Sequence, residues 1–375
     1  MVLILVLYSI PTASAKAGML TPSGIPYDAL KDRVDEYAAK YIGTSTAGAN
    51  VLIVKDGEIF ISTSYGYADI ENQIKITPDT VFEWGSVTKL LVWTSVMQLV
   101  EQGKLELNED IRAYLPDGFL TKLQYDTPIT MLNLMHHDAG WEEKFTDLFY
   151  MSAAEVKPLE EMLHITEPYQ VHEPGAVVAY SNYGVALAGF IVEQLTAQPF
   201  YDYINEHIFS VLEMKDTSIH PTQEDNLDVA INREVVYGYS VNSDNEFNVS
   251  KNERIFIGLY PAGSAIGTIA DAAKFMMALM PANGMTSPLF QNHHTLDEML
   301  TTSDFYGDGF PRNAHGFWEG LYTVDVLEHA GNTDSFSSNF TFSKDEQLGV
   351  IIMTNQMGEA GLSYGLPTLV YGDYS

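Results

Sequence analysis

Cysteine is absent from the 375-residue sequence, and this absence removes two kinds of chemistry. Without a thiol the protein has neither a cysteine nucleophile nor a zinc–thiolate site. It also forms no disulfide bonds. Because exported proteins do not all rely on disulfides, the missing cysteines leave the compartment open.

Basic residues are scarce: 19 lysines and arginines stand against 50 acidic residues, which gives a formal net charge of −31. Such a protein repels phosphate backbones, so nucleic acid is not expected as a partner, and anionic membrane surfaces are disfavoured for the same reason. We interpret the acidic excess as a solvated surface, of a kind also seen in salt-adapted proteins, and assign it no catalytic role.

Long hydrophobic runs are missing as well. The apolar run at residues 2–10, VLILVLYSI, is too short to cross a bilayer, and no stable membrane span is expected. It ends at Pro11 before Ala13, Ser14 and Ala15, which is typical of a secretory signal, although no lysine or arginine precedes the run. We therefore predict a signal segment at residues 1–15 and export to the periplasm or the extracellular space; the alternative is a buried strand.

Strand patterns occur near both ends of the remaining chain. Asn50–Asp69 alternates around the turn Lys55-Asp56-Gly57, a strong hairpin signal, and strand character returns at residues 316–327, 335–342 and 348–355. Helical spacing predominates between them, for example at Asn182–Thr196 and Thr268–Met280, and a last helix is expected near Leu366–Tyr371. The sequence contains no internal repeat or linker, so residues 16–375 are expected to form a single domain.

This order of elements predicts a fold of the α/β class, of the α+β type. We expect an antiparallel sheet built from both chain ends, at about residues 27–75 and 315–372, with helices flanking it. A large, mainly helical lobe at about residues 80–290 would be inserted between the two parts of the sheet. The cleft between the lobes is then the natural place for a site.

The stretch Val81–Gly103, VFEWGSVTKLLVWTSVMQLVEQG, places Ser86 and Lys89 at the start of a predicted apolar helix. Residues at i and i+3 share nearly the same helical face, so Lys89 could touch Ser86 and take its proton. The positive end of the helix dipole would favour an oxyanion and disfavour a charged ammonium. Since such pairs also occur by chance, the alternative is a capped core helix, and catalysis requires partner groups elsewhere.

Two further segments supply candidate partners. Tyr180 and Asn182 lie on a turn between Glu173-Pro174-Gly175 and a predicted helix, where both side chains could point into a cleft. His329-Ala330-Gly331-Asn332 follows an apparent strand, and its small residues would let a substrate lie along the backbone edge. The alternatives are a hydrogen-bonded buried tyrosine at 180 and a helix N-cap at 182.

Read in order, the motifs are SVTK, YSN and HAG, and with them the chain resembles a family of serine hydrolases. The family comprises class C β-lactamases, penicillin-binding D,D-peptidases, D-aminopeptidases and related esterases, and the resemblance covers roughly residues 27–360. It extends to segments outside the motifs, such as ITMLNLMHHDAGW and YPAGSAIGTIADAAKFMMALM.

The resemblance implies a role for each motif residue. Ser86 would be the acylated nucleophile, and Lys89 and Tyr180 the pair that handles its proton. Asn182 would hydrogen-bond the substrate amide, with His329, Gly331 and Asn332 completing the substrate-binding site. The backbone N–H groups of Ser86 and Asn332 would form the oxyanion hole. Tyrosine and lysine both titrate near pH 10, so each needs burial or a neighbouring charge to act at neutral pH.

Two positions depart from the family pattern. His329 stands where class C β-lactamases usually have lysine, and a histidine is mostly neutral near pH 7, so we expect a weaker grip on a substrate carboxylate. HHDAG stands where the family tends to have HTSG, and we interpret His136 and His137 as structural. Neither this pair nor His293-His294 shows zinc-ligand spacing with a third ligand, so no metal is expected.

One competing motif is rejected. Gly361-Leu362-Ser363-Tyr364-Gly365 matches the nucleophile elbow of α/β-hydrolases, but that fold needs an aspartate and a histidine after the serine, and the last histidine is His329. Residues 263–267 lack the lysine of a phosphate loop, so no cofactor is expected.

The sequence thus predicts a serine hydrolase that cleaves an amide, ester or β-lactam through an acyl-enzyme on Ser86. Its partner would be a small-molecule or peptide substrate, and the oligomeric state stays open. The alternative is a catalytically idle relative that binds peptides or cell-wall fragments.

Overall fold

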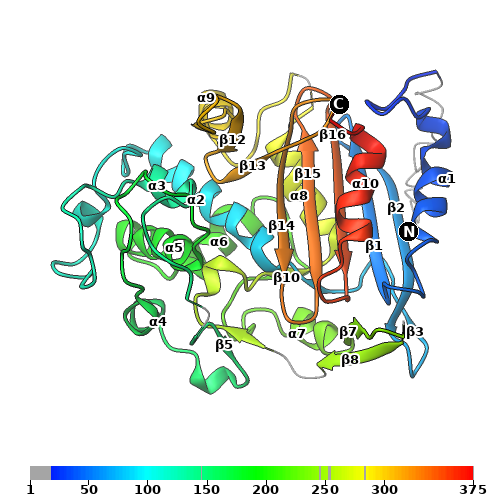
Figure 1. Ribbon diagram of the computed structural model, residues 1–375, viewed down its shortest axis with the longest axis horizontal. Coiled ribbons are helices and arrows are strands. Elements are labelled where there is room, and N and C mark those ends of the chain that lie inside the picture. Colours follow the sequence, from blue (N-terminus) through cyan, green and yellow to red (C-terminus); the bar gives the residue numbers. More distant parts are fainter. Residues whose placement is uncertain (1–17, 145, 245, 252–254, 283, 375) are drawn as a thin grey trace, which may run out of the picture.

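The computed structural model describes residues 18–144, 146–244, 246–251, 255–282 and 284–374. The predicted signal segment, residues 1–15, lies outside this part of the chain. The largest element is a nine-stranded antiparallel sheet with the strand order β11-β12-β13-β14-β15-β16-β1-β2-β3 (Figure 1). No helix of the described residues is both long enough and apolar enough to cross a membrane.

Strands from both ends of the chain form this sheet, as the sequence predicts. The N-terminal part and the C-terminal part meet where β1 pairs with β16. The strands are β1 (Gly48–Lys55), β2 (Glu58–Asp69), β3 (Ile74–Lys75), β11 (Asp304–Phe305), β12 (Pro311–Ala314), β13 (Phe317–Gly320), β14 (Val326–Asn332), β15 (Ser337–Ser343) and β16 (Leu348–Thr354).

The turn between β1 and β2 has the predicted conformation. Asp56 and Gly57 both have positive φ, at 54° and 77°. Two-residue hairpins need this backbone conformation to follow the strand twist, and an aspartate followed by glycine adopts it at low cost.

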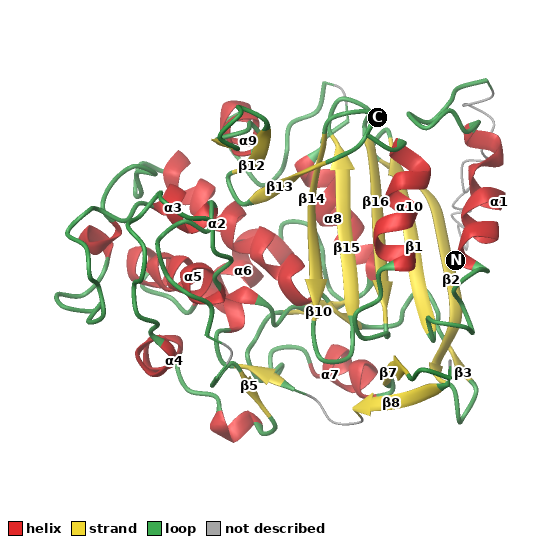
Figure 2. Ribbon diagram, in the orientation of Figure 1, coloured by secondary structure: helices red, strands yellow, loops and turns green. Residues whose placement is uncertain are grey.

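Helices cover both faces of the sheet. The helices α1 (Tyr27–Ala38) and α10 (Gly361–Tyr371) lie on one face, and α8 (Ile269–Leu279) and α2 (Lys89–Glu101) lie on the other (Figures 1 and 2). Strand β1 shows the division, because Val51 and Ile53 pack in the α1–α10 core whereas Leu52 and Val54 pack in the larger core around α2. Helix α2 is buried along nearly its whole length.

Between the two parts of the sheet the chain is helical up to about residue 209. These helices are the 3₁₀ turns η2 (Gly85–Thr88), η3 (Ile111–Tyr114) and η4 (Ala153–Glu155), the α-helices α3 (Met131–Met135), α4 (Leu159–Thr166), α5 (Asn182–Thr196) and α6 (Phe200–Ile204), and the π-helical turn η5 (Asn205–Phe209). The predicted helix at 182–196 matches α5 at both ends.

The later part of this region is less helical than predicted. It contains the helices α7 (Leu227–Glu234), η6 (Tyr260–Ala262) and α9 (His293–Met299), but also the short strands β6 (Thr217–Ser218), β7 (Gly238–Val241), β8 (Phe247–Lys251), β9 (Phe256–Ile257) and β10 (Ile266–Gly267). Two further short strands, β4 (Phe82–Glu83) and β5 (Phe149–Tyr150), lie in the earlier part and pair with β10 and β9. These strands pair over long sequence separations, for example β4 with β10, which local periodicity cannot reveal.

Two predicted boundaries in the C-terminal part are wrong. Residues 316–327 were expected to form one strand, but β13 ends at Gly320 and β14 begins at Val326. The HAGN segment therefore lies within β14, and does not follow a strand. The final helix begins at Gly361, well before the expected Leu366, because the carboxylate of Glu359 accepts hydrogen bonds from the first N–H groups of α10.

Candidate active site

Ser86 and Lys89 lie at the junction of the 3₁₀ turn η2 and helix α2. Ser86 is in the turn, and Lys89 is the first residue of the α-helix, so regular α-helix begins later than predicted. Gly85 has a positive φ of 51°, and a Cβ atom there would lie 2.8 Å from the backbone nitrogen of Asn332. Only glycine therefore lets the turn approach strand β14 this closely.

Lys89 is fully buried and its ammonium group contacts three oxygen atoms. Nζ lies 3.0 Å from Oγ of Ser86, 2.7 Å from Oδ1 of Asn182 and 2.5 Å from the carbonyl oxygen of Ala262. Burial lowers the pKa of Lys89 to about 7, and the charge of Glu143 opposes this shift only in part. A large fraction of Lys89 is then neutral near pH 7 and able to accept a proton.

Tyr180 lies over the same pair. Lys89 Nζ is 4.9 Å from the centre of the Tyr180 ring, and the ring of His137 stacks on the Tyr180 ring with a centroid separation of 4.5 Å. Burial raises the pKa of the Tyr180 phenol, and a hydrogen bond with Ser86 acts in the opposite direction. The phenol is therefore protonated at neutral pH, and it is better placed to donate a proton than to remove one.

His137 holds Tyr180 in place. The structural role that we predicted for His137 is therefore a specific one, the positioning of Tyr180. Its Nδ1 accepts a hydrogen bond from the backbone N–H of Ser181 at 3.1 Å, and its ring also stacks on Trp318. His136 by contrast bonds Ser303 Oγ at 2.8 Å, away from Ser86. The sequence gives no signal that separates these two adjacent histidines.

Asn182 connects Lys89 to a carboxylate that sequence reasoning missed. Its Oδ1 accepts from Lys89, while its Nδ2 donates to Oε1 of Glu143 at 2.7 Å and its backbone N–H donates to Oε2 at 2.9 Å. These partners fix the orientation of the amide and leave one Nδ2 hydrogen without a hydrogen-bond partner in the described part of the chain. The helix N-cap alternative is wrong, because Ser181 caps α5 through Gly184. In so acidic a chain, nothing in the sequence singles out Glu143.

His329 is buried on β14, and its tautomer follows from one contact. Its Nδ1 lies 2.7 Å from the carbonyl oxygen of Ala330, which can only accept, so Nδ1 carries the proton. Nε2 is then an acceptor, buried and without a hydrogen-bond partner among the described residues. Burial, together with the charge of Lys89, lowers the pKa of His329 to about 3. This imidazole stays neutral and presents a lone pair.

Gly331 and Asn332 lie against the turn that carries Ser86. A Cβ atom on Gly331 would lie 2.1 Å from the carbonyl oxygen of Trp84 and 2.9 Å from the backbone nitrogen of Ser86. The backbone nitrogens of Ser86 and Asn332 are thus both held at this contact between η2 and β14. The side chain of Asn332 accepts a hydrogen bond from Ser337 Oγ at 2.8 Å.

A pocket of about 480 Å³ opens over these groups. The edge of β14 from His329 to Asn332 faces this pocket. This part of the edge is open because β13 pairs only with Val326–Glu328. Five of the seven predicted site residues line this pocket, whereas Lys89 contacts Ser86 from the interior and Gly331 packs against the backbone of the serine turn. Its lining is Gly85, Ser86, Leu148, Phe149, Tyr180, Asn182, Ile257, Ala262, Gly263, Trp318, Glu328, His329, Ala330, Asn332 and Tyr364. A few polar groups within an apolar lining are typical of a small-molecule site.

Ser363 of the rejected GxSxG motif lies elsewhere. It is 2% exposed on α10, and its Oγ bonds the carboxylate of Glu359 at 2.8 Å. Ser363 has a structural role, because its hydroxyl is buried and is bonded to the carboxylate of Glu359, which lies just before the N-terminus of α10.

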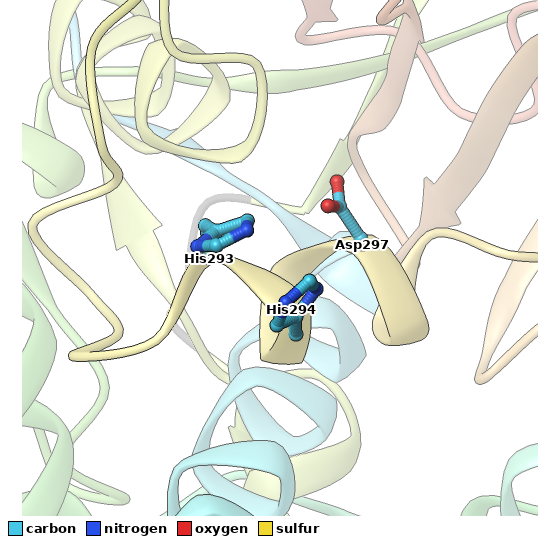
Figure 3. A group of neighbouring side chains, drawn as sticks. All are labelled: His293, His294 and Asp297. Carbon is cyan, nitrogen blue, oxygen red and sulfur yellow. The ribbon is translucent and has the colours of Figure 1, made fainter.

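One group of metal-ligating residue types occurs among the described residues, formed by His293, His294 and Asp297 on α9 (Figure 3). Their donor atoms lie within 4.8 Å of one another, whereas donors bound to one zinc ion are roughly 3.4 Å apart. All three side chains are exposed, and Asp297 already pairs with Lys344. Asp297 lies four residues after His293 and is the third residue of this group, which the prediction from the His293-His294 spacing did not include. The group lies on the surface and is not arranged as a metal site.

The nine-stranded sheet with its flanking helices, and the pocket at which SVTK, YSN and HAG meet, define a β-lactamase/D,D-peptidase-like fold. The family profile described as Beta-lactamase matches residues 30–369, so the chain belongs to the β-lactamase family. It is 26% identical over 316 residues to Protein flp of Staphylococcus aureus (strain MW2), a match that covers 83% of this chain and 60% of flp. The chain thus spans about three fifths of the length of the curated relatives it matches.

Solved structures share the fold. The D-amino acid amidase from Ochrobactrum anthropi SV3 superposes with a TM-score of 0.73 at 25% identity, over 92% of this chain and 96% of that chain. The octameric penicillin-binding protein homologue from Pyrococcus abyssi gives a TM-score of 0.71 at 20% identity, over 92% and 77%. A β-lactamase/D-alanine carboxypeptidase from Pseudomonas syringae gives 0.71 at 18%, over 91% and 98%.

Proposed function

We propose that this chain is a serine hydrolase that forms an acyl-enzyme on Ser86. The observation that carries the proposal is the 3.0 Å contact between Lys89 Nζ and Ser86 Oγ, made by a buried lysine whose pKa is lowered to about 7. A neutral amine at this distance can accept the hydroxyl proton as the oxygen attacks a carbonyl carbon.

Tyr180 would pass a proton to the leaving group, because its phenol is protonated and bonded to Ser86. The backbone N–H groups of Ser86 and Asn332 would stabilise the negative charge that forms on the carbonyl oxygen. Asn182, oriented by Glu143, would donate its free Nδ2 hydrogen to the substrate. After the leaving group departs, the Tyr180 phenolate would take a proton from the water that attacks the acyl-enzyme, and Lys89 would return its proton to Oγ of Ser86, which restores the starting state.

The acyl donor would be an ester, an amide of a D-configured residue or a β-lactam. Hydrolase names among the structural relatives, an amidase and carboxypeptidases, support this range. Within it we propose a preference for neutral and amine-bearing substrates over carboxylate-bearing β-lactams. His329 supports the preference: its imidazole stays neutral and its Nε2 is a buried acceptor, so the side chain offers a carboxylate neither a positive charge nor a donor.

The experiment compares a chromogenic β-lactam, a short-chain ester and a D-amino-acid amide in parallel at pH 7 to 8. We expect the ester or the amide to show the highest kcat/KM, and His329→Lys to narrow the gap by lowering KM for the β-lactam. The preference would be overturned if the native protein hydrolysed the β-lactam with a higher kcat/KM than every neutral ester or D-amide, and if added salt did not change this order.

The second candidate is an idle binding protein. A fluorophosphonate probe separates it from the hydrolase, because such a probe labels an activated serine and leaves an inert one untouched. Export, as indicated by residues 1–15, also stays a proposal, and fractionation of the native cells tests it.

A further inference from the structure

The catalytic pocket continues around the free edge of β14 to the opposite face of the sheet. Successive residues of a strand point to opposite faces, so His329 faces α2 while Glu328 and Ala330 face α10. Glu328 and Tyr364 line the catalytic pocket, and both also line a second pocket of about 400 Å³. The two pockets therefore share a boundary at these residues.

The second pocket is lined mainly by aromatic rings and carboxylates. Its residues are Tyr306, Phe310, Pro311, Glu319, Leu321, Tyr322, Glu328, Tyr364 and Thr368. Tyr306 and Tyr364 are about half exposed, at 52% and 48%, so their ring surfaces are available to a ligand. Aromatic faces combined with carboxylates form the usual binding environment for an organic ammonium group.

The Glu328 carboxyl lacks a cationic partner among the described residues, and burial raises its pKa, so a bound cation would favour its charged form. Its carboxylate accepts a hydrogen bond from the Tyr322 hydroxyl at 3.0 Å, and among the described residues no lysine, arginine or histidine forms an ion pair with it. Arg312 does not line this pocket; it lies 5.3 Å from the centre of the Tyr306 ring and is paired with Asp304. The Tyr306 ring therefore already has a neighbouring cation, whereas the part of the pocket near Glu328 has none among the described residues.

The position of the second pocket indicates which part of the substrate, the acyl group or the leaving group, would reach it. Tyr180, the proposed proton donor to the leaving group, lies beside His329 at a ring distance of 6.5 Å, and His137 links it to Trp318. A leaving group would therefore depart along Trp318 and His329 toward Glu328. Glu328 is four residues from Asn332 along β14, so the distance from the scissile carbonyl to its carboxylate is on the order of 10 Å.

We propose that the second pocket binds a cationic ammonium group at the far end of the substrate's leaving group, held between Glu328 and the rings of Tyr322 and Tyr364. This inference rests on the proposed hydrolase function and names its substrate class more closely. The leaving groups that fit are alcohols or amines with an ammonium group several bonds from the cleaved bond. A carboxylate at that end would meet Glu328 and Glu319 instead.

The test uses three thioacetates on the full chain. Their leaving thiols carry an alkyl chain that places a trimethylammonium group, its neutral tert-butyl isostere or a carboxylate on the order of 10 Å from the carbonyl. All three give the same acetyl-enzyme, so deacylation is identical and any difference in kcat/KM reports binding and departure of the leaving thiol. The released thiol is measured by a colorimetric thiol reagent.

We expect the native protein to prefer the ammonium thioester over its neutral isostere by about tenfold or more in kcat/KM, with the carboxylate poorest. Glu328→Gln should bring that ratio close to one, and Tyr364→Leu should reduce it several-fold. The matched control is Asp345→Asn, which removes one charge in the exposed turn between β15 and β16 and should keep the native ratio.

Two outcomes overturn the inference: a native ratio near one, or a native preference that Glu328→Gln leaves unchanged. If the Glu328 variant does not fold, the native ratio alone decides. Hydrolysis of the neutral thioester without ammonium preference defeats only the second pocket, whereas no hydrolysis of any thioester defeats the proposed hydrolase function as well.

Discussion

Lys89 Nζ lies 3.0 Å from Ser86 Oγ while the lysine side chain is completely buried. The contact matters because the two facts act together: proximity alone would give a charged ammonium that cannot accept a proton, and burial alone would give a neutral amine with nothing to deprotonate. Asn182 and the Ala262 carbonyl hold the amine at this distance.

The first prediction concerns pH. Because the protonated ammonium of Lys89 cannot act as a base, kcat/KM for a neutral ester should rise with pH and level off above a midpoint near pH 7. Below the midpoint the rate should fall about tenfold per pH unit, as for the loss of one proton. The measurement is a pH profile of kcat/KM between pH 5 and 9.

His329 offers the control for that profile. Burial lowers its pKa to about 3, so it does not titrate in this range, and His329→Asn should keep the midpoint near pH 7 whatever its rate. Lys89→Arg should abolish the transition together with activity, since arginine stays protonated. A midpoint that disappears in His329→Asn would assign the titration to the histidine and remove Lys89 as the base.

The second prediction concerns Tyr180. Tyr180→Phe keeps the ring that stacks on His137 and removes only the hydroxyl, so we expect kcat to fall by ~10²–10⁴ while KM changes little. Tyr183→Phe is the matched control, because the Tyr183 hydroxyl is buried in the next turn and has no hydrogen-bond partner among the described residues. Near-normal kcat in Tyr180→Phe would take the phenol out of the proton pathway.

The third prediction concerns the contact between β14 and the serine turn. In Gly331→Ala the added methyl group would displace the backbone at Ser86 and Trp84. We expect a loss of about 1–3 kcal/mol in the free energy of unfolding and a fall in kcat of ~10²-fold or more. Gly307→Ala is the control, since nothing lies within 4 Å of a Cβ at that position. Equal behaviour of the two variants in thermal melts and turnover assays would contradict the account.

The sequence predicted the main sheet, helix α5 and the residues that gather in the pocket. These predictions depend on local signals: alternation around Asp56-Gly57, apolar spacing at 182–196 and the spacing within SVTK and YSN. Such signals lie in contiguous segments, so they can be read without knowing which segments meet.

Features that arise from contacts between distant segments could not be read in this way. Glu143 belongs to the site because of its hydrogen bonds to Asn182. His137 belongs to it because its ring stacks on Tyr180 and Trp318. The tautomer of His329 depends on its contact with the next carbonyl oxygen, which needs side-chain coordinates. The strand boundary at Gly320 likewise depends on pairing between β13 and β14.

The most direct test of the central claim is to find the acyl group itself. The native protein is incubated with a slow ester or amide substrate, quenched in acid and digested, and the modified peptide is identified by mass spectrometry. We predict an acyl adduct on the peptide that carries Ser86, and none in Ser86→Ala, whose circular dichroism should match the native protein. An adduct on the peptide that carries Ser363, or labelling that persists in Ser86→Ala, would contradict the assignment of Ser86 as the nucleophile.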